Sequence, residues 1–298
     1  MPVIVAALLV AQALAPAPAV RLAVDARALQ PGELVVLTVT TSAPVASVRG
    51  RAFDRPLAPW RVDDTTWRAL IGIDLDVAPG AYDVTVEAGP AAAPVRAARR
   101  LVVSAKQFPT RRLTVNPDFV NPPATVLARI EAEAKRISAI WQSSATSPLW
   151  TGAFMTPVPE RANSAFGTRS IFNGQARSPH GGADFPSPEG TPVRAPNAGR
   201  VVLAGDLYYT GRTVAIDHGL GLVSLFAHLS AIDVVEGARV DSGQTVGRVG
   251  STGRVTGAHL HWTVRAGGAR IDPLSLVAVL GPDVDKAPGA RSGDVPRQ

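Results

Sequence analysis

Short stretches in which apolar and polar residues alternate, separated by turn residues, constrain the fold of this chain most. In residues 82–87 every second side chain is apolar, and residues 67–74 follow the same pattern less strictly. Pro31-Gly32 and Pro79-Gly80 mark turns between such stretches. About seven strands within residues 20–104 predict an antiparallel β-sandwich of immunoglobulin-like type. This segment contains no histidine and no cysteine, so we expect a spacer or regulatory module there and no catalytic site.

Residues 105–156 are predicted to link two domains and to contain one amphipathic helix. Asn121-Pro122-Pro123 is a favourable helix start, because prolines are tolerated in the first turn. Apolar side chains then recur on one face at helical spacing, at Val126, Leu127, Ile130, Ala134, Ile137 and Trp141. The serine-rich stretch 143–147 ends the pattern. We expect this helix to pack on a neighbouring domain. Residues 277–298 are expected to form a flexible tail, since proline, glycine and charged residues prevail after Pro282.

The first 19 residues are predicted to be a secretory signal peptide. Residues 3–10 are all apolar, and Ala17-Pro18-Ala19 has the small-residue pattern of a cleavage site. A helix needs roughly 20 apolar residues to cross a bilayer, and Pro16 and Pro18 end this run too early. We therefore expect no stable membrane span in the mature chain, and export to the periplasm or cell envelope. The alternative is a disordered extension rich in alanine and proline.

Composition narrows the chemistry that the chain can support. It has no cysteine, so a metal must be held by His, Asp or Glu. Its net charge of +6 comes from scattered basic residues, of which only three are lysine. A scattered basic surface suits a polyanionic partner such as a cell-wall polymer. Nucleic acid is not expected, because no basic stripe with interleaved aromatic residues is present.

Three segments contain the residues that could form a chemical site. The first is 178–185, in which His180 and Asp184 stand four positions apart. The second is 225–230, with His228 at its centre, and the third is 257–264, with the pattern His-Leu-His at 259–261. All five histidines of the chain lie in its last 120 residues. This clustering predicts that the second half of the chain is the functional half.

The His-Leu-His pattern has a specific geometric meaning. Side chains two positions apart on a strand point to the same face. His259 and His261 are therefore expected to project into one pocket, whereas Leu260 and Trp262 pack on the other side. Imidazoles on an otherwise apolar strand need polar partners when they are buried, and a metal ion is one such partner.

A mixed set of imidazole and carboxylate ligands suits Zn²⁺. A catalytic zinc has three protein ligands and an open fourth position, and its reaction needs a proton acceptor and a proton donor. The chain offers four histidines in addition to Asp184 as candidates for these roles, and no H-E-x-x-H motif is present. The spare histidines could fill the acid and base roles.

From about Pro157 to Pro273 the chain resembles the M23 metallopeptidases, the family that includes lysostaphin-like and LytM-like cell-wall endopeptidases. About 120 residues match in the correct order, which makes the resemblance specific. The matching segments are Phe166–Arg169, His180–Asp184, Gly190–Ala195, Gly199–Val202, Ile216–Gly219, His228–Ser230, Gly243-Gln244, Gly250–Gly253 and His259–His261.

This resemblance implies a fold, a reaction and a set of residue roles. The fold would be a β-rich, barrel-sandwich-like M23-type peptidase domain at residues 157–276. His180, Asp184 and His261 match the ligands of one zinc ion per chain, and His228 and His259 match the two catalytic histidines. The substrate would be peptidoglycan, cleaved in its stem or cross-link peptides by a zinc-activated water.

Two residues depart from, or stand outside, this pattern. Phe226 occupies a position where the family usually has tyrosine, so any help that this phenol gives in catalysis would be absent, unless Tyr208 or Tyr209 supplies it. His218 lies in a turn-like segment, and we expect it at a turn or rim, not among the ligands. Arg169 and Asn173 are candidates for the border of the substrate groove.

Of the other functions that the sequence suggests, one, that of a cofactor carrier, is excluded. Residues 235–253 resemble a biotinyl or lipoyl carrier, but there is no lysine between Lys135 and Lys286 to hold such a cofactor. A non-catalytic M23-like protein could bind the cell wall or activate another hydrolase, although the complete set of predicted ligands argues against it. The N-terminal sandwich could bind glycan, or could cover the groove as a lid. A regulatory envelope protein is a possible partner.

Overall fold

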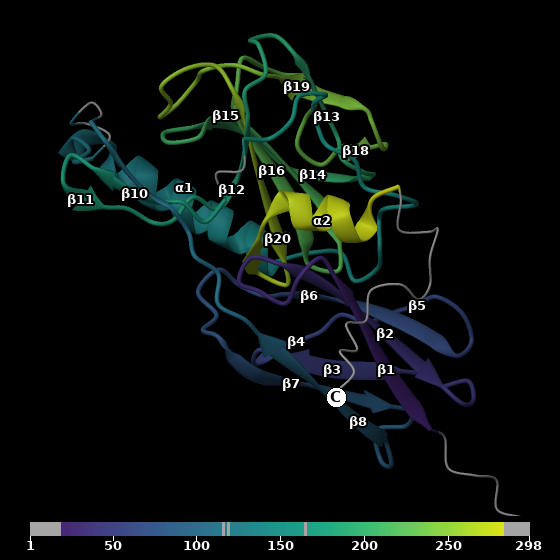
Figure 1. Cartoon of the computed structure of the whole chain (residues 1–298). Coiled ribbons are helices and arrows are strands. Elements are labelled where there is room, and N and C mark those ends of the chain that lie inside the picture. Colours follow the sequence, from purple (N-terminus) through teal and green to yellow (C-terminus); the bar gives the residue numbers. More distant parts are fainter. Residues whose placement is uncertain (1–18, 115–116, 118–119, 164–165, 283–298) are drawn as a thin grey trace, which may run out of the picture.

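The computed structural model of the protein describes residues 19–114, 117, 120–163 and 166–282, and these form a mainly β fold, as predicted (Figure 1). The predicted signal peptide, except its last residue, and the last 16 residues of the predicted tail lie outside the described residues. In the part of the chain that is described, no helix is both long enough and apolar enough to cross a membrane.

The N-terminal region is a sandwich of two four-stranded antiparallel sheets, ordered β1-β2-β6-β5 and β4-β3-β7-β8. Apolar side chains at alternating positions, such as Val84 and Val86, fill the space between the sheets. The predicted sandwich is thus present, while its immunoglobulin-like type stays a prediction. Its strands are β1 (Val20–Ala26), β2 (Leu34–Thr41), β3 (Val48–Ala52), β4 (Arg55–Pro56), β5 (Trp60–Arg61), β6 (Thr66–Gly72), β7 (Gly80–Ala88) and β8 (Val95–Val103).

The C-terminal region is built on a seven-stranded antiparallel sheet in the order β12-β20-β16-β15-β14-β18, with β21 paired to β20. A second sheet has the order β13-β19-β17. The strands of the large sheet are β12 (Gly182–Phe185), β14 (Gly199–Leu207), β15 (Gly211–Gly219), β16 (Leu222–Leu229), β18 (Arg239–Val240), β20 (Leu260–Ala266) and β21 (Ala269–Ile271). Those of the second are β13 (Pro192–Arg194), β17 (Ala231–Ile232) and β19 (Thr245–Arg248).

The predicted linker contributes a strand as well as the expected helix. Its strand β9 (Thr110–Leu113) pairs in parallel with β10 (Arg169–Phe172), which also pairs with β11 (Gln175–Ala176). Helix α1 (Ala124–Gln142) follows, and its last turns pack Ile137 and Trp141 against the large sheet. The linker is therefore an integral part of the C-terminal region.

The two regions share one hydrophobic core. Leu34 and Leu70 of the sandwich belong to the same buried cluster as Trp262 of the large sheet. Between them lies helix α2 (Pro273–Leu280), which starts at the N-cap Asp272. This helix corrects one predicted boundary, because residues 277–280, expected in the flexible tail, are helical. Their apolar side chains, with Val279 2% exposed, pack between the two regions.

Buried charges reinforce this junction. Glu33 is 2% exposed and lies 2.7 Å from Arg27 and 3.0 Å from Lys106. Arg27 also reaches Asp272 at the start of α2, at 2.7 Å. Although burial opposes the charge of Glu33, these two cations hold its pKa below the usual value. Removing one member of such a buried group leaves an uncompensated charge, so the group favours one fixed docking of the two regions.

Candidate metal and catalytic site

The pairing of two adjacent strands brings Asp184 and His261 together. Strands β12 and β20 are antiparallel neighbours, and Asp184 lies directly opposite His261 in their register. Residues opposite each other in a sheet share a face. Leu260 and Trp262 point the other way and are fully buried. The prediction that the His-Leu-His pattern divides between a site and the core is correct.

Three ligand atoms converge at this point. His180 Nε2 lies 2.9 Å from His261 Nδ1 and 3.0 Å from Asp184 Oδ1, and His261 Nδ1 lies 2.9 Å from that same oxygen. The two nitrogens and one oxygen therefore form a triangle with edges close to 3 Å. The side chains that we predicted as metal ligands are the three that the fold brings together.

Protons alone cannot satisfy all three contacts. If His180 and His261 both donate to Asp184, two N–H groups face each other. If His180 donates to Nδ1 of His261 instead, the lone pair on that Nδ1 also faces the Asp184 carboxylate, and the two repel each other. A cation inside the triangle is attracted to all three atoms. Bond lengths of about 2.0–2.1 Å around tetrahedral zinc place ligand atoms about 3.3 Å apart, close to the edges found here. The donor set therefore fits a zinc ion.

The protonation states expected for these side chains also fit metal binding. Burial raises the pKa of Asp184, but hydrogen bonds with His180 and His261 outweigh it and hold the pKa well below its usual range. Burial lowers the pKa of His261. Asp184 is therefore ionised and His261 is neutral at pH 7, which are the forms in which a carboxylate and an imidazole bind a metal.

Two further residues fix the position of the His261 ring: Thr263 by a side-chain contact and Gly182 by leaving room for the ring. Thr263 Oγ1 lies 2.9 Å from His261 Nε2 and, being two positions further along β20, on the same face of the strand. Gly182 lies opposite Thr263, and a Cβ atom there would be 2.8 Å from Cε1 of His261 and 2.4 Å from the Trp262 carbonyl oxygen. The alternation His-x-His-x-Thr at residues 259–263 is the sequence pattern that predicts Thr263 on the same face of the strand as His261.

His228 reaches the site because of an unusual backbone conformation. Phe226 pairs with Trp262 on the core side of the sheet, and regular alternation would direct His228 to that side too. His228 has a φ of 65°, in the left-handed region, and its N–H donates to the Thr210 carbonyl at 2.8 Å. Its ring consequently lies 5.0 Å from that of His259 and 6.0 Å from that of His261, centroid to centroid.

Both predicted catalytic histidines are held in the same tautomer. The Nδ1 atom of His228 lies 2.8 Å from the Thr252 carbonyl oxygen, and that of His259 lies 2.9 Å from the Gly257 carbonyl oxygen. Because a carbonyl only accepts, each Nδ1 carries a proton, and Nε2 is the atom of each ring that is left for other contacts. Burial, helped by the neighbouring His261, lowers the pKa of His228 to about 4. His228 is thus a neutral proton acceptor at pH 7.

Phe226 and His218 lie in the core. Phe226 is fully buried and stacks on Trp262, on the face of the sheet opposite His261, so a hydroxyl at this position would not face the site. His218, expected at a turn or rim, is fully buried at the end of β15. Its Nδ1 donates to the Ala198 carbonyl at 2.8 Å and its Nε2 contacts Ser224 Oγ at 3.0 Å. His218 is a structural residue.

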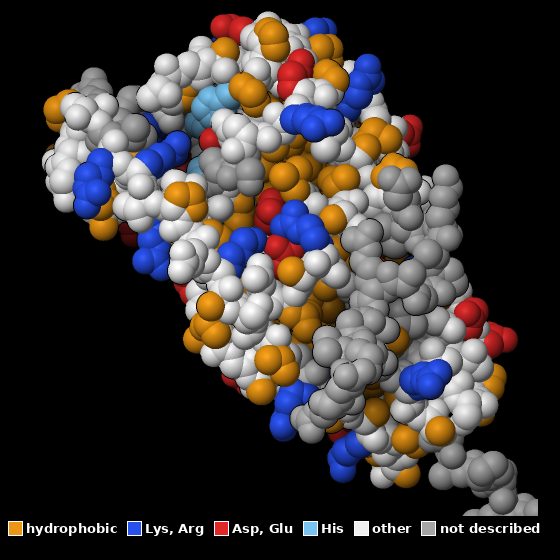
Figure 2. All heavy atoms as spheres, in the orientation of Figure 1, with side chains coloured by type: hydrophobic (Ala, Val, Ile, Leu, Met, Phe, Trp, Pro, Cys, Tyr) orange, Lys and Arg blue, Asp and Glu red, His pale blue; other side chains and the backbone are white. Residues whose placement is uncertain are grey.

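The site is open at the surface of the C-terminal region. The side chains of the three predicted ligands and His259 are 12–22% exposed, and Figure 2 shows histidine side chains at the surface, away from the sandwich. The sandwich meets the opposite end of β20, where Gly72 lies against Ala266 and Ala269. Five residues of strand, about 17 Å, separate Ala266 from His261. The sandwich also contacts a segment next to the site, because Gly32 packs against the ring of Phe166 and the neighbouring Gly167 N–H donates to the His180 carbonyl. The lid hypothesis therefore stays a prediction.

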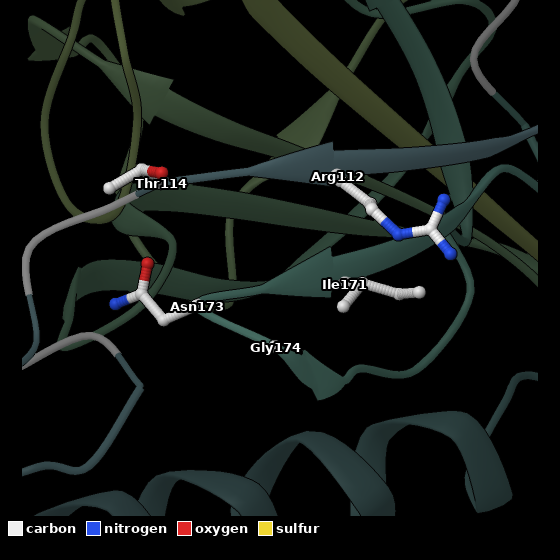
Figure 3. Close-up of a pocket in the computed structure, with 5 residues that line it drawn as sticks. All are labelled: Arg112, Thr114, Ile171, Asn173 and Gly174. Atoms are coloured by element: carbon white, nitrogen blue, oxygen red, sulfur yellow. The ribbon is translucent and has the colours of Figure 1, made fainter.

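A cavity of about 360 Å³ lies along β9 and β10, lined by Arg112, Thr114, Ile171, Asn173 and Gly174 (Figure 3). None of the five predicted site residues lines it. Asn173, which we expected to border the substrate groove, belongs to this cavity. Arg169 is exposed at the start of β10.

Three converging metal-ligand atoms beside two further histidines, on a β-rich domain, form a candidate metal-dependent hydrolytic site. Comparison with known proteins gives the family: the model of peptidase family M23 matches residues 178–273. A crystal structure of an M23 peptidase from Pseudomonas aeruginosa is 32% identical, with a TM-score of 0.63, over 84% of this chain and 95% of the other. The chain belongs to peptidase family M23.

Two curated relatives carry more specific names. The DD-carboxypeptidase/endopeptidase Mpg of Neisseria meningitidis is 44% identical over 108 residues, which are 36% of this chain and 25% of that protein. The peptidoglycan DD-endopeptidase ShyA of Vibrio cholerae is 37% identical over 127 residues, or 42% of this chain and 30% of that protein. The chain thus spans less than a third of the length of these relatives.

Proposed function

We propose that the protein is a zinc-dependent endopeptidase that hydrolyses peptide bonds in the stem or cross-link peptides of peptidoglycan. The observation that carries this proposal is the triangle of His180, Asp184 and His261 with two further histidines, His228 and His259, beside it. Membership of family M23 and relatives named DD-endopeptidases support the substrate class and favour D,D cross-links.

His180, Asp184 and His261 would hold the zinc ion, which, when bound, lowers the pKa of a water molecule and polarises the scissile carbonyl. Asp184 supplies one negative charge to the ligand set. His228 and His259 each carry a proton on Nδ1, so Nε2 is the atom through which either ring would accept a proton from the attacking water. The protonated ring can then stabilise the negative charge on the carbonyl oxygen and return the proton to the leaving amine.

The test is hydrolysis of purified peptidoglycan by the zinc-loaded protein, with the released fragments identified by mass. We expect one zinc per chain and fragments from cleaved D,D cross-links. Asp184→Asn should lose zinc and activity. Asp206→Asn is the matched control, because Asp206 is exposed on β14. A zinc-loaded protein that binds peptidoglycan without releasing fragments would instead be a non-catalytic M23-like protein.

We further propose that the protein acts in the cell envelope, after export through the signal peptide predicted at residues 1–19. Peptidoglycan lies outside the cytoplasm, so a hydrolase of this substrate has to be exported. The apolar run at residues 3–10 supports the prediction. Cell fractionation of the full chain, compared with a chain that lacks residues 2–19, tests it: only the full chain should be exported.

A further inference from the structure

One acidic side chain lies on the face of α1 that packs against the large sheet. Glu133 is three positions after Ile130 and four before Ile137, so at helical spacing these side chains share one face. Ile137 packs on apolar side chains of the large sheet, and the Glu133 side chain is only 17% exposed. A carboxylate in this position needs hydrogen-bond partners, because an unpaired charge held away from water is costly.

Both oxygens of this carboxylate have a partner. Arg129, one helical turn earlier on α1, donates from Nε to Oε1 at 2.6 Å, and the backbone N–H of Tyr208 donates to Oε2 at 2.8 Å. Strands β14 and β15 pair as far as Leu207 and Gly211, so Tyr208 is the first residue of the turn between them. Glu133 thus fixes the start of the 208–210 turn to the helix of the linker.

The other two residues of this turn support His228. The Thr210 carbonyl accepts the N–H of His228 at 2.8 Å, which anchors the left-handed backbone of that residue. The Tyr209 carbonyl accepts the N–H of Arg254 at 2.8 Å, in the loop whose Thr252 carbonyl accepts the proton of His228 Nδ1. Two successive carbonyls of the turn therefore anchor the predicted catalytic residue, one through its backbone and one through the loop that holds its ring.

The turn and this loop are also in direct backbone contact. A Cβ atom at Gly211 would lie 2.4 Å from the carbonyl carbon of Thr252, and a Cβ atom at Gly253 would lie 2.6 Å from the Tyr209 carbonyl oxygen. Backbones this close cannot shift independently of one another. A displacement of the turn is therefore passed on to the Thr252 carbonyl, and from there to Nδ1 of His228.

We propose that Glu133 is a positioning residue for catalysis: by holding the Tyr208 N–H it keeps the 208–210 turn, and through it the ring of His228, in the place where this ring accepts a proton. The inference rests on the proposed peptidase function and adds to it a residue from outside the family segment 178–273. A proton acceptor has to lie within hydrogen-bond distance of its donor, and a misplacement of about 1 Å can cost about 100-fold in rate.

The test compares Glu133→Ala with Glu133→Gln in steady-state cleavage of a soluble cross-linked peptide dimer by the zinc-loaded full chain. Glu133→Ala should lower kcat about 10- to 100-fold, with KM within about twofold of the wild type, because substrate binding does not depend on His228. It should still bind one zinc per chain. Glu133→Gln should recover most of the activity, because its amide oxygen also accepts the Tyr208 N–H.

Glu236→Ala is the matched control. Glu236 pairs with Arg136 of α1, and both side chains are about half exposed. This variant therefore removes a carboxylate that binds the same helix at a different point, and it should keep the kcat of the wild type.

A second measurement does not depend on activity: hydrogen exchange of the His228 N–H in the zinc-free proteins, followed by NMR. This exchange should be about 10-fold faster in Glu133→Ala, because the bond to the Thr210 carbonyl opens more often, and unchanged in Glu133→Gln and Glu236→Ala. Wild-type kcat or wild-type exchange in Glu133→Ala would overturn the inference. So would a loss of zinc in Glu133→Ala, a Glu133→Gln variant as slow as Glu133→Ala, or an equal loss in Glu236→Ala. If the wild type does not cleave the dimer, the proposed function fails, and the exchange alone decides whether Glu133 positions His228.

Discussion

Thr263 offers a direct test of how the chain prepares His261 to bind zinc. A neutral imidazole has one N–H, and a metal needs the lone pair of the other nitrogen. Nδ1 of His261 is the atom that faces Asp184 and His180, whereas Nε2 faces Thr263 Oγ1 at 2.9 Å. The hydroxyl oxygen can accept the Nε2 proton, which leaves the Nδ1 lone pair for the metal.

Thr263→Val keeps the shape of this side chain and removes the acceptor. In the metal-free variant the proton can move to Nδ1 and bond Asp184, so stability should change little. Zinc binding forces the proton back to Nε2, where it is buried without a partner, at a cost of about 1–3 kcal/mol. This corresponds to zinc affinity about 10- to 100-fold weaker, the usual effect of losing such a partner.

The measurement is competition for zinc with a coloured chelator, together with urea unfolding of the metal-free proteins. Thr263→Ser keeps the hydroxyl and should bind zinc nearly as tightly as the wild type, while His261→Ala should bind far more weakly than either. Wild-type affinity in Thr263→Val would refute this account of His261. Wild-type affinity in His261→Ala would refute the metal site itself.

Three further predictions follow from the packing. Gly182→Ala should lose zinc binding, measured by metal analysis, because the added methyl group would overlap the ring of His261; tight binding would contradict the packing. Burial lowers the pKa of His218 to about 4. Between pH 6.5 and 4, His218 is therefore protonated in the unfolded chain and neutral in the folded chain. Stability should therefore fall with pH towards 4, by about 2 kcal/mol between pH 7 and 5 from this residue, and urea unfolding of His218→Gln should show a correspondingly smaller fall. A fragment of residues 145–298 should aggregate, because it exposes the apolar side chains of the C-terminal region that pack on Leu34 of the sandwich. Light scattering measures the aggregation, and a monomeric, folded fragment would contradict this prediction.

The parts of the fold and site that the sequence predicts correctly depend on local periodicity and on motif order. Alternation over residues 82–87 predicts β7, and helical spacing from Val126 to Trp141 predicts α1. The alternation rule also predicts that His261 and Trp262 lie on opposite faces of their strand, with Trp262 in the core. In each case the signal lies within a few residues, so no knowledge of distant contacts is needed.

The features that the sequence did not predict depend on contacts between distant segments or on a single backbone angle. The parallel pairing of β9 with β10 joins residues 59 positions apart, such as Arg111 and Ser170. The left-handed conformation of His228 turns its side chain out of the core, against the alternation of its strand. His218 looked like a loop residue because glycines follow it, yet β15 and β16 bury it completely.

The shared core changes how a role of the sandwich in regulation can be tested. Removing the sandwich would expose Leu276 and leave Arg270 without Asp74, its partner at 2.5 Å, so a change in activity would reflect folding as much as the loss of a restraint. The sandwich contacts the far end of β20 through Gly72 and the ring of Phe166 through Gly32. A restraint located in the N-terminal half of the chain has two routes to the site: the contact of Gly32 with Phe166, and the linker, whose strand β9 pairs with the strand that leads to His180. Substitutions that weaken this pairing, such as Arg111→Ala, leave the shared core intact and are the cleaner way to separate regulation from folding.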